Sequence, residues 1–573
     1  MRCRLAPLHV LVVRVVALVL VLAVAAACEG ERSAPPTPSP AAARPEAAPA
    51  ATGPAAAKQD AVPAEPPIDP APWWAGAVFY EVFVRSFQDS DKDGIGDLEG
   101  LVQRLDYLND GDPKTTTDLG VDAIWLMPVF QSPSYHGYDV VDYEKIEEDY
   151  GTGEDFQRFL DEAHRRGMRV ILDLVLNHTS VEHPWFIDSA SSPTSKKRAW
   201  YVWSDKKLDW GQPWNASEPT WHEKNGAYYY AIFWGGMPDL DYRNPEVRAE
   251  ARRLAALWLG RGVDGFRLDA IRHLVEDGPG PGQSKSPETH AFLRELGASV
   301  RAAKKDAVLV GEVWSTTFDI AEYYGKSGRD ELQLLFDFPL SEAIAGAVNG
   351  GQSGDLVAAL GMVKNAYPAA AVDAPFLANH DQVRLATQLG GDASRLRLAA
   401  AILLTMAGTP FLYYGEEIGL ANGEGKEDEW KRTPMPWDGS ARHGFTAGKP
   451  WHAFAPGKAT VAGESKDPRS LLARYRALIA ARKASPALSR GGIEVVATPG
   501  AQGAALAFVR ASGDDRVLVV HNLSGEKLDT GAMTAPGRAA EPLLVDRGAT
   551  LVVEGTGWRA SLPARASGIW RLR

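Results

Sequence analysis

Cysteine is nearly absent from this chain, since only Cys3 and Cys28 occur among its 573 residues. A mature chain beginning at Cys28 would keep one thiol and could form no internal disulfide. Positive charge is also in deficit, with 61 Lys and Arg against 73 Asp and Glu and a formal net charge of −12. This balance argues against a nucleic-acid or anionic-membrane partner, because those partners require basic patches. An uncharged polar ligand is compatible with it.

Long apolar runs are scarce, apart from VVALVLVLAV between Val15 and Val24, which follows several arginines. A basic stretch, a short apolar run and small residues are typical of an export signal, and this run is too short to span a bilayer. We expect residues 1–27 to be a signal peptide cleaved before Cys28. The AAAC sequence resembles that of bacterial lipoproteins, although Ala25 stands where a branched aliphatic residue is usual. The protein is therefore expected to be exported, either secreted or held at the cell surface or outer membrane through a lipidated Cys28.

Aromatic residues are missing between about Glu31 and Pro72, where Ala, Pro, Ser, Thr and Glu predominate. This composition cannot build a core, so residues 28–72 are expected to form a disordered, partly extended tether. The 17 Trp, 17 Tyr and 18 Phe of the chain can supply a large core beyond it. The length suits two or three domains.

Eight apolar runs follow the tether, separated by amphipathic segments such as GEDFQRFLDEAHRRG and EVRAEARRLAALWLGRG. Most of the runs are continuous rather than alternating, as in strands buried on both faces of a parallel sheet. Eight strand–helix alternations predict an α/β fold, the (β/α)8 TIM barrel. The runs are AVFYEVFVRSF, VDAIWLMPVF, MRVILDLVLNH, GVDGFRLDA, AVLVGEVW, LQLLFDF, APFLANHD and TPFLYYGEEIG.

Two further regions interrupt or follow the barrel. The aromatic-rich stretch after the third strand is too long for an ordinary loop and predicts an inserted subdomain. The tail alternates between apolar and polar residues and has glycine-rich turns, which predicts a C-terminal antiparallel β-sandwich domain. Its Trp558 and Trp570 are expected to pack in the core of that domain. The predicted domains are the barrel at 73–178 and 244–488, the inserted subdomain at 179–243 and the β domain at 489–573.

Carboxylates end three of the predicted strands, at Asp269, Glu312 and Asp381. Barrel enzymes build their sites at these C-terminal strand ends. Cleavage of a glycosidic bond needs one carboxylate to attack the anomeric carbon and one carboxylic acid to protonate the leaving oxygen. A structural ion pair could explain any one of the three, whereas the set together favours a hydrolytic site.

The neighbours of two of these carboxylates suggest different protonation states. Arg267 lies two residues before Asp269, so both side chains point to the same face of a strand. A guanidinium there would keep Asp269 ionised, as a nucleophile requires. Glu312 is flanked by apolar Val313 and Trp314, which would raise its pKa toward that of a general acid.

Five segments then occur in a fixed order: DLVLNH, MPDLD, GFRLDAIRH, GEVW and FLANHD. They resemble the conserved regions of the α-amylase clan, glycoside hydrolase family 13, which contains retaining glycosidases and transglycosidases. FYEVFVRSFQDSDKDGIGDLEG, HGYDVVDY and TPFLYYGEEIG extend the resemblance from about Trp73 to the end of the barrel. The pattern is most similar to bacterial α-amylases intermediate between oligo-1,6-glucosidases and neopullulanases.

The resemblance implies a role for each matched residue. Asp269 would be the nucleophile and Glu312 the acid/base, while Asp381 would hold sugar hydroxyls as positive charge develops at the anomeric carbon. The reacting carboxyl groups are expected about 5–5.5 Å apart, as in retaining glycosidases. Tyr138 would stack on the sugar ring and Arg267 would support the nucleophile. The expected substrate-binding residues are Tyr138, Asp139, His178, Arg267 and His380.

Linkage preference is suggested by two positions within these segments. Met237 stands where α-1,6-specific relatives usually have Gln, and Ala270 stands where they tend to have Val. Both favour α-1,4 cleavage of starch and malto-oligosaccharides, although Asp241 departs from the Asn usual in the subgroup. The alternatives are an α-glucosidase, a glucanotransferase or a trehalose-forming isomerase and, more remotely, a non-catalytic glycan-binding relative. We expect a monomer that acts on α-glucans.

The loop DSDKDGIGD after the first strand has oxygen donors spaced like the first half of an EF-hand. Gly100 stands where the bidentate Glu of an EF-hand belongs, so an EF-hand is excluded. A solvated acidic loop would explain the spacing alone. The resemblance instead implies a structural Ca²⁺ that clamps this loop, away from bond cleavage. The implied ligands are Asp89, Asp91, Asp93, the Ile95 carbonyl and Asp97.

Overall fold

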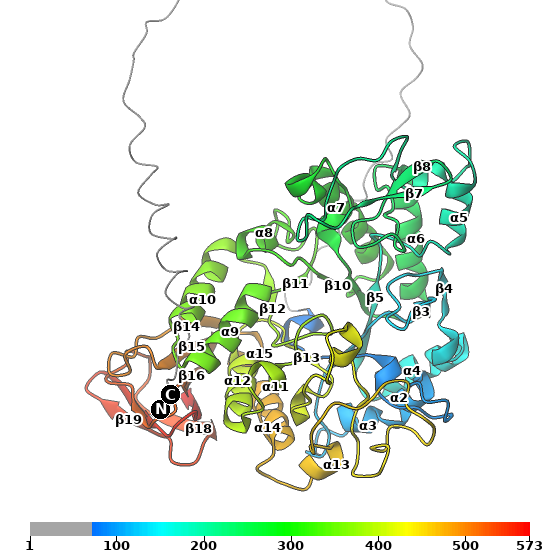
Figure 1. The fold of residues 1–573 in the computed structure, drawn as a ribbon. Coiled ribbons are helices and arrows are strands. Elements are labelled where there is room, and N and C mark those ends of the chain that lie inside the picture. The colour runs from blue at the N-terminus through cyan, green and yellow to red at the C-terminus, as the bar shows by residue number, and fades with distance from the viewer. Residues whose placement is uncertain (1–71) are drawn as a thin grey trace, which may run out of the picture. The chain divides into compact units, whose positions relative to one another are not determined.

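The protein is described here by a computed structural model that covers residues 72–573 (Figure 1). The predicted signal peptide, Cys28 and nearly all of the predicted tether lie outside the described residues. Within residues 72–573, no helix is both long enough and apolar enough to cross a bilayer.

An eight-stranded parallel sheet lies at the centre of the fold, as the sequence predicts (Figure 1). Its strand order is β12-β11-β10-β9-β5-β2-β1-β13. A parallel bridge between Phe376, just after β12, and Phe411 of β13 closes the sheet into a barrel. The strands are β1 (Phe79–Val82), β2 (Ala123–Leu126), β5 (Arg169–Leu174), β9 (Gly265–Leu268), β10 (Val308–Gly311), β11 (Leu334–Phe336), β12 (Val372–Ala374) and β13 (Phe411–Tyr413).

Helices connect the strands, and their ends follow from local side-chain chemistry. In α4, Phe156 and Phe159 are buried, and Thr152 forms a capping box with Asp155 at the N-terminus. The main connecting helices are α2 (Leu98–Gln103), α3 (Leu105–Leu108), α4 (Gly153–Arg165), α6 (Pro245–Gly260), α7 (Pro287–Ala303), α8 (Thr317–Glu322), α9 (Phe338–Gly350), α10 (Gly354–Ala366), α11 (Leu385–Gln388), α12 (Ala393–Thr405) and α14 (Leu471–Lys483).

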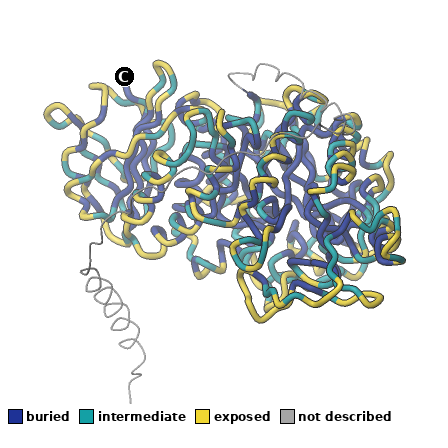
Figure 2. The backbone as a smooth tube through the Cα atoms, turned by 90° about the horizontal axis from the view of Figure 1, so that it is seen from above, coloured by how far each residue is buried: buried dark blue, intermediate teal, exposed yellow. Residues whose placement is uncertain are grey.

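Aromatic side chains fill the interior of the barrel, including Trp125, Phe336 and Phe411. The short 3-10 helix η1 (Trp73–Gly76) lies at the N-terminal ends of the strands. Trp74 is buried in the same cluster, and its carbonyl accepts a hydrogen bond from Thr409, just before β13. In Figure 2 the buried, dark-blue backbone lies inside the folded part of the chain, and the exposed, yellow segments lie at its surface. The barrel is thus packed and closed at the end where its strands begin.

The inserted region between β5 and α6 contains a helix and a three-stranded sheet, β6-β8-β7. These are α5 (Pro184–Ser191), β6 (Trp203–Ser204), β7 (Trp221–Lys224) and β8 (Ala227–Tyr230). A second small element, the hairpin of β3 (Phe130–Gln131) and β4 (Asp142–Ile146), follows β2. Both extend from the C-terminal ends of their strands, which places them beside the predicted site.

The C-terminal region forms two antiparallel sheets that pack around a shared core. Trp558 and Trp570 are buried in that core, as expected. Buried Arg510 donates to the carbonyls of Thr405 and Met406 at the end of α12, which joins this region to the barrel. The strands are β14 (Gly492–Val495), β15 (Ala505–Ser512), β16 (Asp515–Asn522), β17 (Leu528–Asp529), β18 (Ala540–Val545), β19 (Thr550–Glu554), β20 (Gly557–Leu562) and β21 (Ser567–Leu572).

Candidate active site

A cavity of about 870 Å³ opens at the C-terminal ends of the barrel strands. Apolar and aromatic side chains supply most of its wall, with a few charged groups between them. Such a composition is typical of a site for a small organic ligand. Its lining consists of Tyr135, His136, Tyr138, His178, Pro213, Trp214, Phe233, Trp234, Met237, Asp269, Ala270, Arg272, His273, Glu312, Trp314, Asp381, Asp428 and Arg432.

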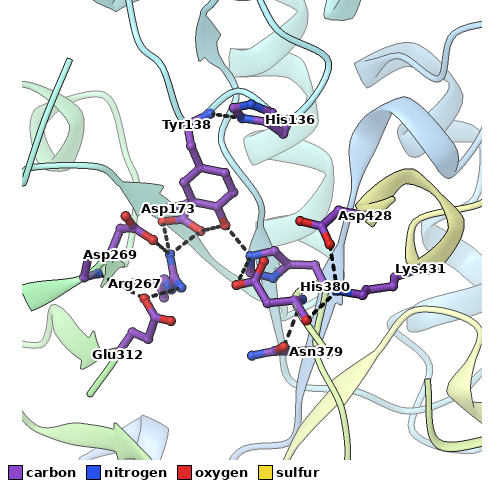
Figure 3. A network of polar contacts seen from close by, with 12 residues as sticks. His136, Tyr138, Asp173, Arg267, Asp269, Glu312, Asn379, His380, Asp428 and Lys431 are labelled. Atoms are coloured by element: carbon purple, nitrogen blue, oxygen red, sulfur yellow. Dashed lines mark hydrogen bonds and ion pairs between the residues drawn. The ribbon is translucent and has the colours of Figure 1, made fainter. Parts of the chain in front are cut away.

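Arg267 lies at the base of this cavity and joins its carboxylates (Figure 3). Its guanidinium is fully buried, and Nη1 lies 2.6 Å from Oδ1 of Asp269 and 2.9 Å from Oδ1 of Asp173. Nη2 lies 3.0 Å from Oε2 of Glu312. One guanidinium therefore holds the two carboxyl groups that follow β9 and β10. The spacing predicts the contact with Asp269, whereas the contact with Glu312 appears only in the fold.

The backbone turn after β9 also positions Glu312. Ala270 has a φ of 49°, in the left-handed region that non-glycine residues rarely adopt. Its amide donates to Oε2 of Glu312 at 3.0 Å. Because Oε2 faces both this amide and Arg267, a proton on Glu312 belongs on Oε1.

The protonation of Glu312 is set mainly by burial. Burial raises the pKa of Glu312 to about 7, with Asp269 and Asp381 adding to the shift and Arg267 opposing it. Val313 is buried, as predicted, but Trp314 is 47% exposed and stacks on Phe338. The direction of the shift agrees with the sequence argument, although Trp314 forms part of the cavity wall rather than covering Glu312.

Asp381 faces Asp269 and Glu312 across the same cavity and has two cationic neighbours. Its Oδ1 lies 2.9 Å from Nη2 of Arg432 and its Oδ2 lies 3.1 Å from Nε2 of His380. Burial alone would raise the pKa of Asp381, but His380 and Arg432 hold it well below its usual range. Asp381 is therefore ionised and can accept hydrogen bonds from ligand hydroxyls.

His178 presents an imidazole to the cavity. Its Nε2 is buried and has no hydrogen-bond partner within the part of the chain that the structure describes. Burial lowers the pKa of His178 to about 4, so the ring is neutral at neutral pH. A ligand hydroxyl would satisfy this nitrogen.

The predicted site residues do not all reach the cavity. Five of them line it: Tyr138, His178, Asp269, Glu312 and Asp381. Arg267 and His380 are fully buried directly behind the lining and act on it through hydrogen bonds. Asp139 lies outside the lining, because its carboxylate accepts hydrogen bonds from the hydroxyls of Ser132 and Ser134. In this structure Asp139 orders the loop that carries Tyr138.

Several lining residues are not predictable from the motifs. Asp428 lies in the short 3-10 helix η8 (Asp428–Lys431) after β13, and Arg432 directly follows it, within the charged run KEDEWKR. Trp214, Phe233 and Trp234 come from the inserted region. Only the tertiary fold brings these residues beside Asp381 and Asp269.

The acidic loop after β1 brings together part of its predicted ligand set. Carboxylate oxygens of Asp89, Asp91 and Asp97 lie within 4.8 Å of one another. Asp93 is exposed and outside this group, and its Oδ1 accepts from the Ile95 amide. Oxygen ligands in this number are suitable for part of a Ca²⁺ coordination shell, which takes six to eight oxygens. The donor set therefore fits the predicted cation, with Asp93 as the departure.

The loop geometry depends on one glycine. Gly94 has a φ of 99°, and a side chain there would collide with the carbonyl of Lys449. The Gly94 amide donates to Oδ2 of Asp89, and the amide of Gly100 donates to Asp97. The cluster is consequently preformed by backbone hydrogen bonds.

A parallel (β/α)8 barrel with an arginine-linked carboxylate pair and a third carboxylate in one cavity defines a glycosidase of the barrel class. Residues 81–491 match the family model described as "Alpha amylase, catalytic domain". The chain belongs to this family, family 13 of the glycoside hydrolases. The resemblance read from the ordered segments is thereby confirmed.

Relatives within the family differ in their named activities. The chain is 41% identical over 458 residues to "Alpha-amylase 3" of Dictyoglomus thermophilum, covering 79% of this chain and 86% of the relative. It is 33% identical over 522 residues to an "Oligo-1,6-glucosidase" of Heyndrickxia coagulans, covering 79% and 92%. Among solved structures, the α-amylase from H. orenii superimposes with a TM-score of 0.77 at 38% identity, over 87% of this chain and all of that one.

Proposed function

We propose that this enzyme hydrolyses α-1,4-glucosidic bonds in malto-oligosaccharides and starch by double displacement, with Asp269 as nucleophile and Glu312 as acid/base. The observation that carries the proposal is the shared guanidinium of Arg267, which binds both carboxyl groups while Glu312 has its pKa raised to about 7. An ionised carboxylate beside a protonated one is the pairing that a retaining glycosidase requires.

In the first half-reaction, Glu312 gives its Oε1 proton to the glycosidic oxygen as that oxygen leaves with the bonding electrons. Oδ2 of Asp269, which is the oxygen not held by Arg267, attacks the anomeric carbon and forms a glycosyl ester. In the second half-reaction, the Glu312 carboxylate takes a proton from water. The resulting hydroxide attacks the anomeric carbon, and the Asp269 carboxylate leaves.

The surrounding groups bind the sugar during both steps. The Asp381 carboxylate and the free Nε2 of His178 are positioned to hydrogen-bond ring hydroxyls. Tyr138 is stacked on His380 and presents its ring to the cavity as an apolar wall for a sugar face. Hydrogen bonds that strengthen as positive charge develops on the sugar lower the barrier.

The choice of α-1,4 bonds rests on Met237 and Ala270, which both line the cavity. The oligo-1,6-glucosidase relative supports α-1,6 cleavage as a second candidate. Transfer to a sugar acceptor instead of water would give a glucanotransferase or a trehalose-forming isomerase on the same intermediate.

Product analysis on maltoheptaose separates these activities. We expect a mixture of short malto-oligosaccharides, resolved by anion-exchange chromatography, because the cavity is open at the rim and its wall continues to half-exposed Trp214 and Trp314. Glucose as the sole early product would instead indicate a glucosidase, and chains longer than the substrate would indicate a transferase. Cleavage of isomaltose but not maltose would contradict the α-1,4 assignment.

We further propose that Ca²⁺ binds the loop after β1 through Asp89, Asp91 and Asp97, with the Ile95 carbonyl as a further predicted ligand. The cation would offset most of the negative charge of three clustered carboxylates and clamp the loop that precedes α2. No ion pair with Lys, Arg or His involves these three residues in the structure of residues 72–573. A bound cation would therefore stabilise the fold without entering the reaction.

Chelation should lower the melting temperature. Ca²⁺ at a free concentration of 100 times its Kd adds about 2.7 kcal/mol to the free energy of unfolding. Its removal therefore corresponds to a fall in melting temperature of roughly a few degrees in a large domain. Asp91→Asn should melt near the EDTA-treated wild type and lose its response to EDTA, as followed by scanning calorimetry. Asp112→Asn, an exposed aspartate in another acidic loop, should keep the full response. An equal response to EDTA in the Asp91 variant and the wild type would reject the site.

Export of the protein and lipidation at Cys28 stay predictions from the sequence. An action on polymeric starch outside the cytoplasm would agree with them.

A further inference from the structure

Glu81 is a buried carboxylate inside the barrel that takes no part in the steps above. Along β1, Phe79 packs in the barrel interior and Tyr80 packs outside it, so Glu81 points inward like Phe79. Only 1% of Glu81 is exposed. A buried carboxylate is costly unless a charged or hydrogen-bonding partner compensates it.

That partner is His380. Oε1 of Glu81 lies 2.6 Å from Nδ1 of His380, whose ring is fully buried. The opposite nitrogen, Nε2, lies 3.1 Å from Oδ2 of Asp381. It also lies 2.6 Å from the hydroxyl of Tyr138 (Figure 3). His380 is therefore held between two carboxylates, one at each ring nitrogen.

This geometry favours the protonated form of His380. A neutral imidazole donates from one nitrogen and presents a lone pair at the other. With the proton on Nε2, the Nδ1 lone pair would face the Glu81 carboxylate at 2.6 Å. With the proton on Nδ1, the Nε2 lone pair can accept from the Tyr138 hydroxyl at 2.6 Å, but it also faces Oδ2 of Asp381 at 3.1 Å. Each neutral form therefore sets a lone pair against one of the two carboxylates. The imidazolium donates to both. Burial alone would lower the pKa of His380, but Asp381 and Glu81 raise it to about 9.

The other charged groups around His380 also favour the imidazolium. Arg432 donates to the His380 carbonyl at 3.1 Å and binds Asp381, while Asp173 of β5 accepts from Tyr138 and Arg267. The edge-on ring of Trp125 carries no charge. With Glu312 protonated, the carboxylates of this cluster outnumber its two arginines. Those carboxylates are Glu81, Asp173, Asp269 and Asp381.

We propose that Glu81 is a positioning residue for glycosidic cleavage, which holds His380 as an imidazolium so that Nε2 is a charged donor beside Asp381 and the bound sugar. The proton on Nε2 also fixes the Tyr138 hydroxyl as an acceptor, so that its own proton is directed to Asp173 at 3.0 Å. The role rests on the proposed site and is the same for α-1,4 and α-1,6 bonds.

Glu81→Gln tests the role because it keeps an acceptor oxygen for Nδ1 and removes the charge. Loss of the carboxylate lowers the pKa of His380, so the imidazolium is lost as pH rises through the lowered value. At about pH 8, kcat/KM on maltoheptaose should be about tenfold or more below wild type, and the ratio should return toward one on acidification to about pH 5, by up to tenfold per pH unit. A ratio that stays constant with pH would mean a structural defect and would overturn the proposal.

Glu417→Gln is the matched control. Glu417 is also fully buried, but it binds the hydroxyls of Tyr80 and Tyr107 outside the barrel. It lies outside the cavity lining, so this variant should keep the pH profile of the wild type. The same pH-dependent loss in both variants would show that any buried carboxylate produces it, and would also overturn the proposal.

The wild-type enzyme supplies a test that does not depend on turnover. In ¹⁵N-histidine spectra, with His380 assigned by its loss in His380→Gln, both ring nitrogens should carry protons up to about pH 8. A neutral His380 at neutral pH would reject the proposal even in an active enzyme. Absence of maltoheptaose cleavage would reject the proposed function instead and leave this result intact.

Discussion

Asp269→Asn should lower kcat/KM on maltoheptaose by at least about 10⁴-fold, the loss seen when a reacting group is removed from a catalytic unit. The amide cannot form the glycosyl ester, while its oxygen can still accept from Nη1 of Arg267, so the fold should persist. Steady-state kinetics gives the loss. A 5-fluoro glycosyl fluoride, which is a slow substrate, should form a covalent glycosyl ester with the wild-type enzyme. Mass spectrometry should locate this label on the peptide that contains Asp269.

Asp241→Asn is a suitable control, because Asp241 lies near the same rim but outside the cavity lining, and its side chain accepts from the Arg243 amide. It should keep activity within about threefold, the range of a surface substitution. Activity in the Asp269 variant equal to that of wild type would remove the proposed nucleophile. If neither the wild type nor the Asp269 variant turns over starch or maltodextrins, the chain is a non-catalytic glycan-binding relative.

Glu312 should determine the alkaline limb of the pH profile. Burial raises its pKa to about 7, and the acid form protonates the leaving oxygen. Therefore kcat/KM on maltoheptaose should fall about tenfold per pH unit above about pH 7. Glu312→Gln should remove most of this activity at every pH. Release of fluoride from α-maltosyl fluoride in the first turnover should be reduced much less, because fluoride leaves without a proton, whereas the later hydrolysis of the glycosyl ester still needs Glu312 as base.

Glu276→Gln is the control for Glu312→Gln, because Glu276 is also buried and also has a raised pKa. The pKa of Glu276 is also raised to about 7, mainly by burial, but its partner is Arg243 and it does not line the cavity. The alkaline limb should be unchanged in this variant. An equal loss of maltoheptaose cleavage and of first-turnover fluoride release in Glu312→Gln would argue against the role of Glu312 as the acid.

The barrel was predictable because its strands are continuous apolar runs, which only burial on both faces explains. LQLLFDF and TPFLYYGEEIG, for example, contain β11 and β13. The bounds were less predictable. β12 spans Val372–Ala374, ahead of most of the APFLANHD run, because Pro375 cannot donate a ladder hydrogen bond and the pairing to β11 ends before it.

The site was predictable where one strand carries the relation between two residues. Arg267 lies on β9 and Asp269 directly follows the end of that strand, two residues on, so the strand pattern of side chains brings them together. Asp139 shows the limit of this reasoning, because nothing in the local sequence indicates that Ser132 and Ser134 turn its carboxylate away from the cavity. Arg432 is missed for a similar reason, since its contact with Asp381 spans 51 residues of sequence.

The position of η1, with Trp74 buried at the start of the barrel, has a practical consequence for attaching the enzyme to a support. Trp74 closes the end where the strands begin, whereas the cavity opens where they finish. A support or fusion partner joined ahead of Pro72 therefore meets the folded enzyme at the end opposite to the cavity mouth. Immobilised in this way, the enzyme would keep its mouth free for a polymeric chain, whereas attachment through the inserted region would crowd it.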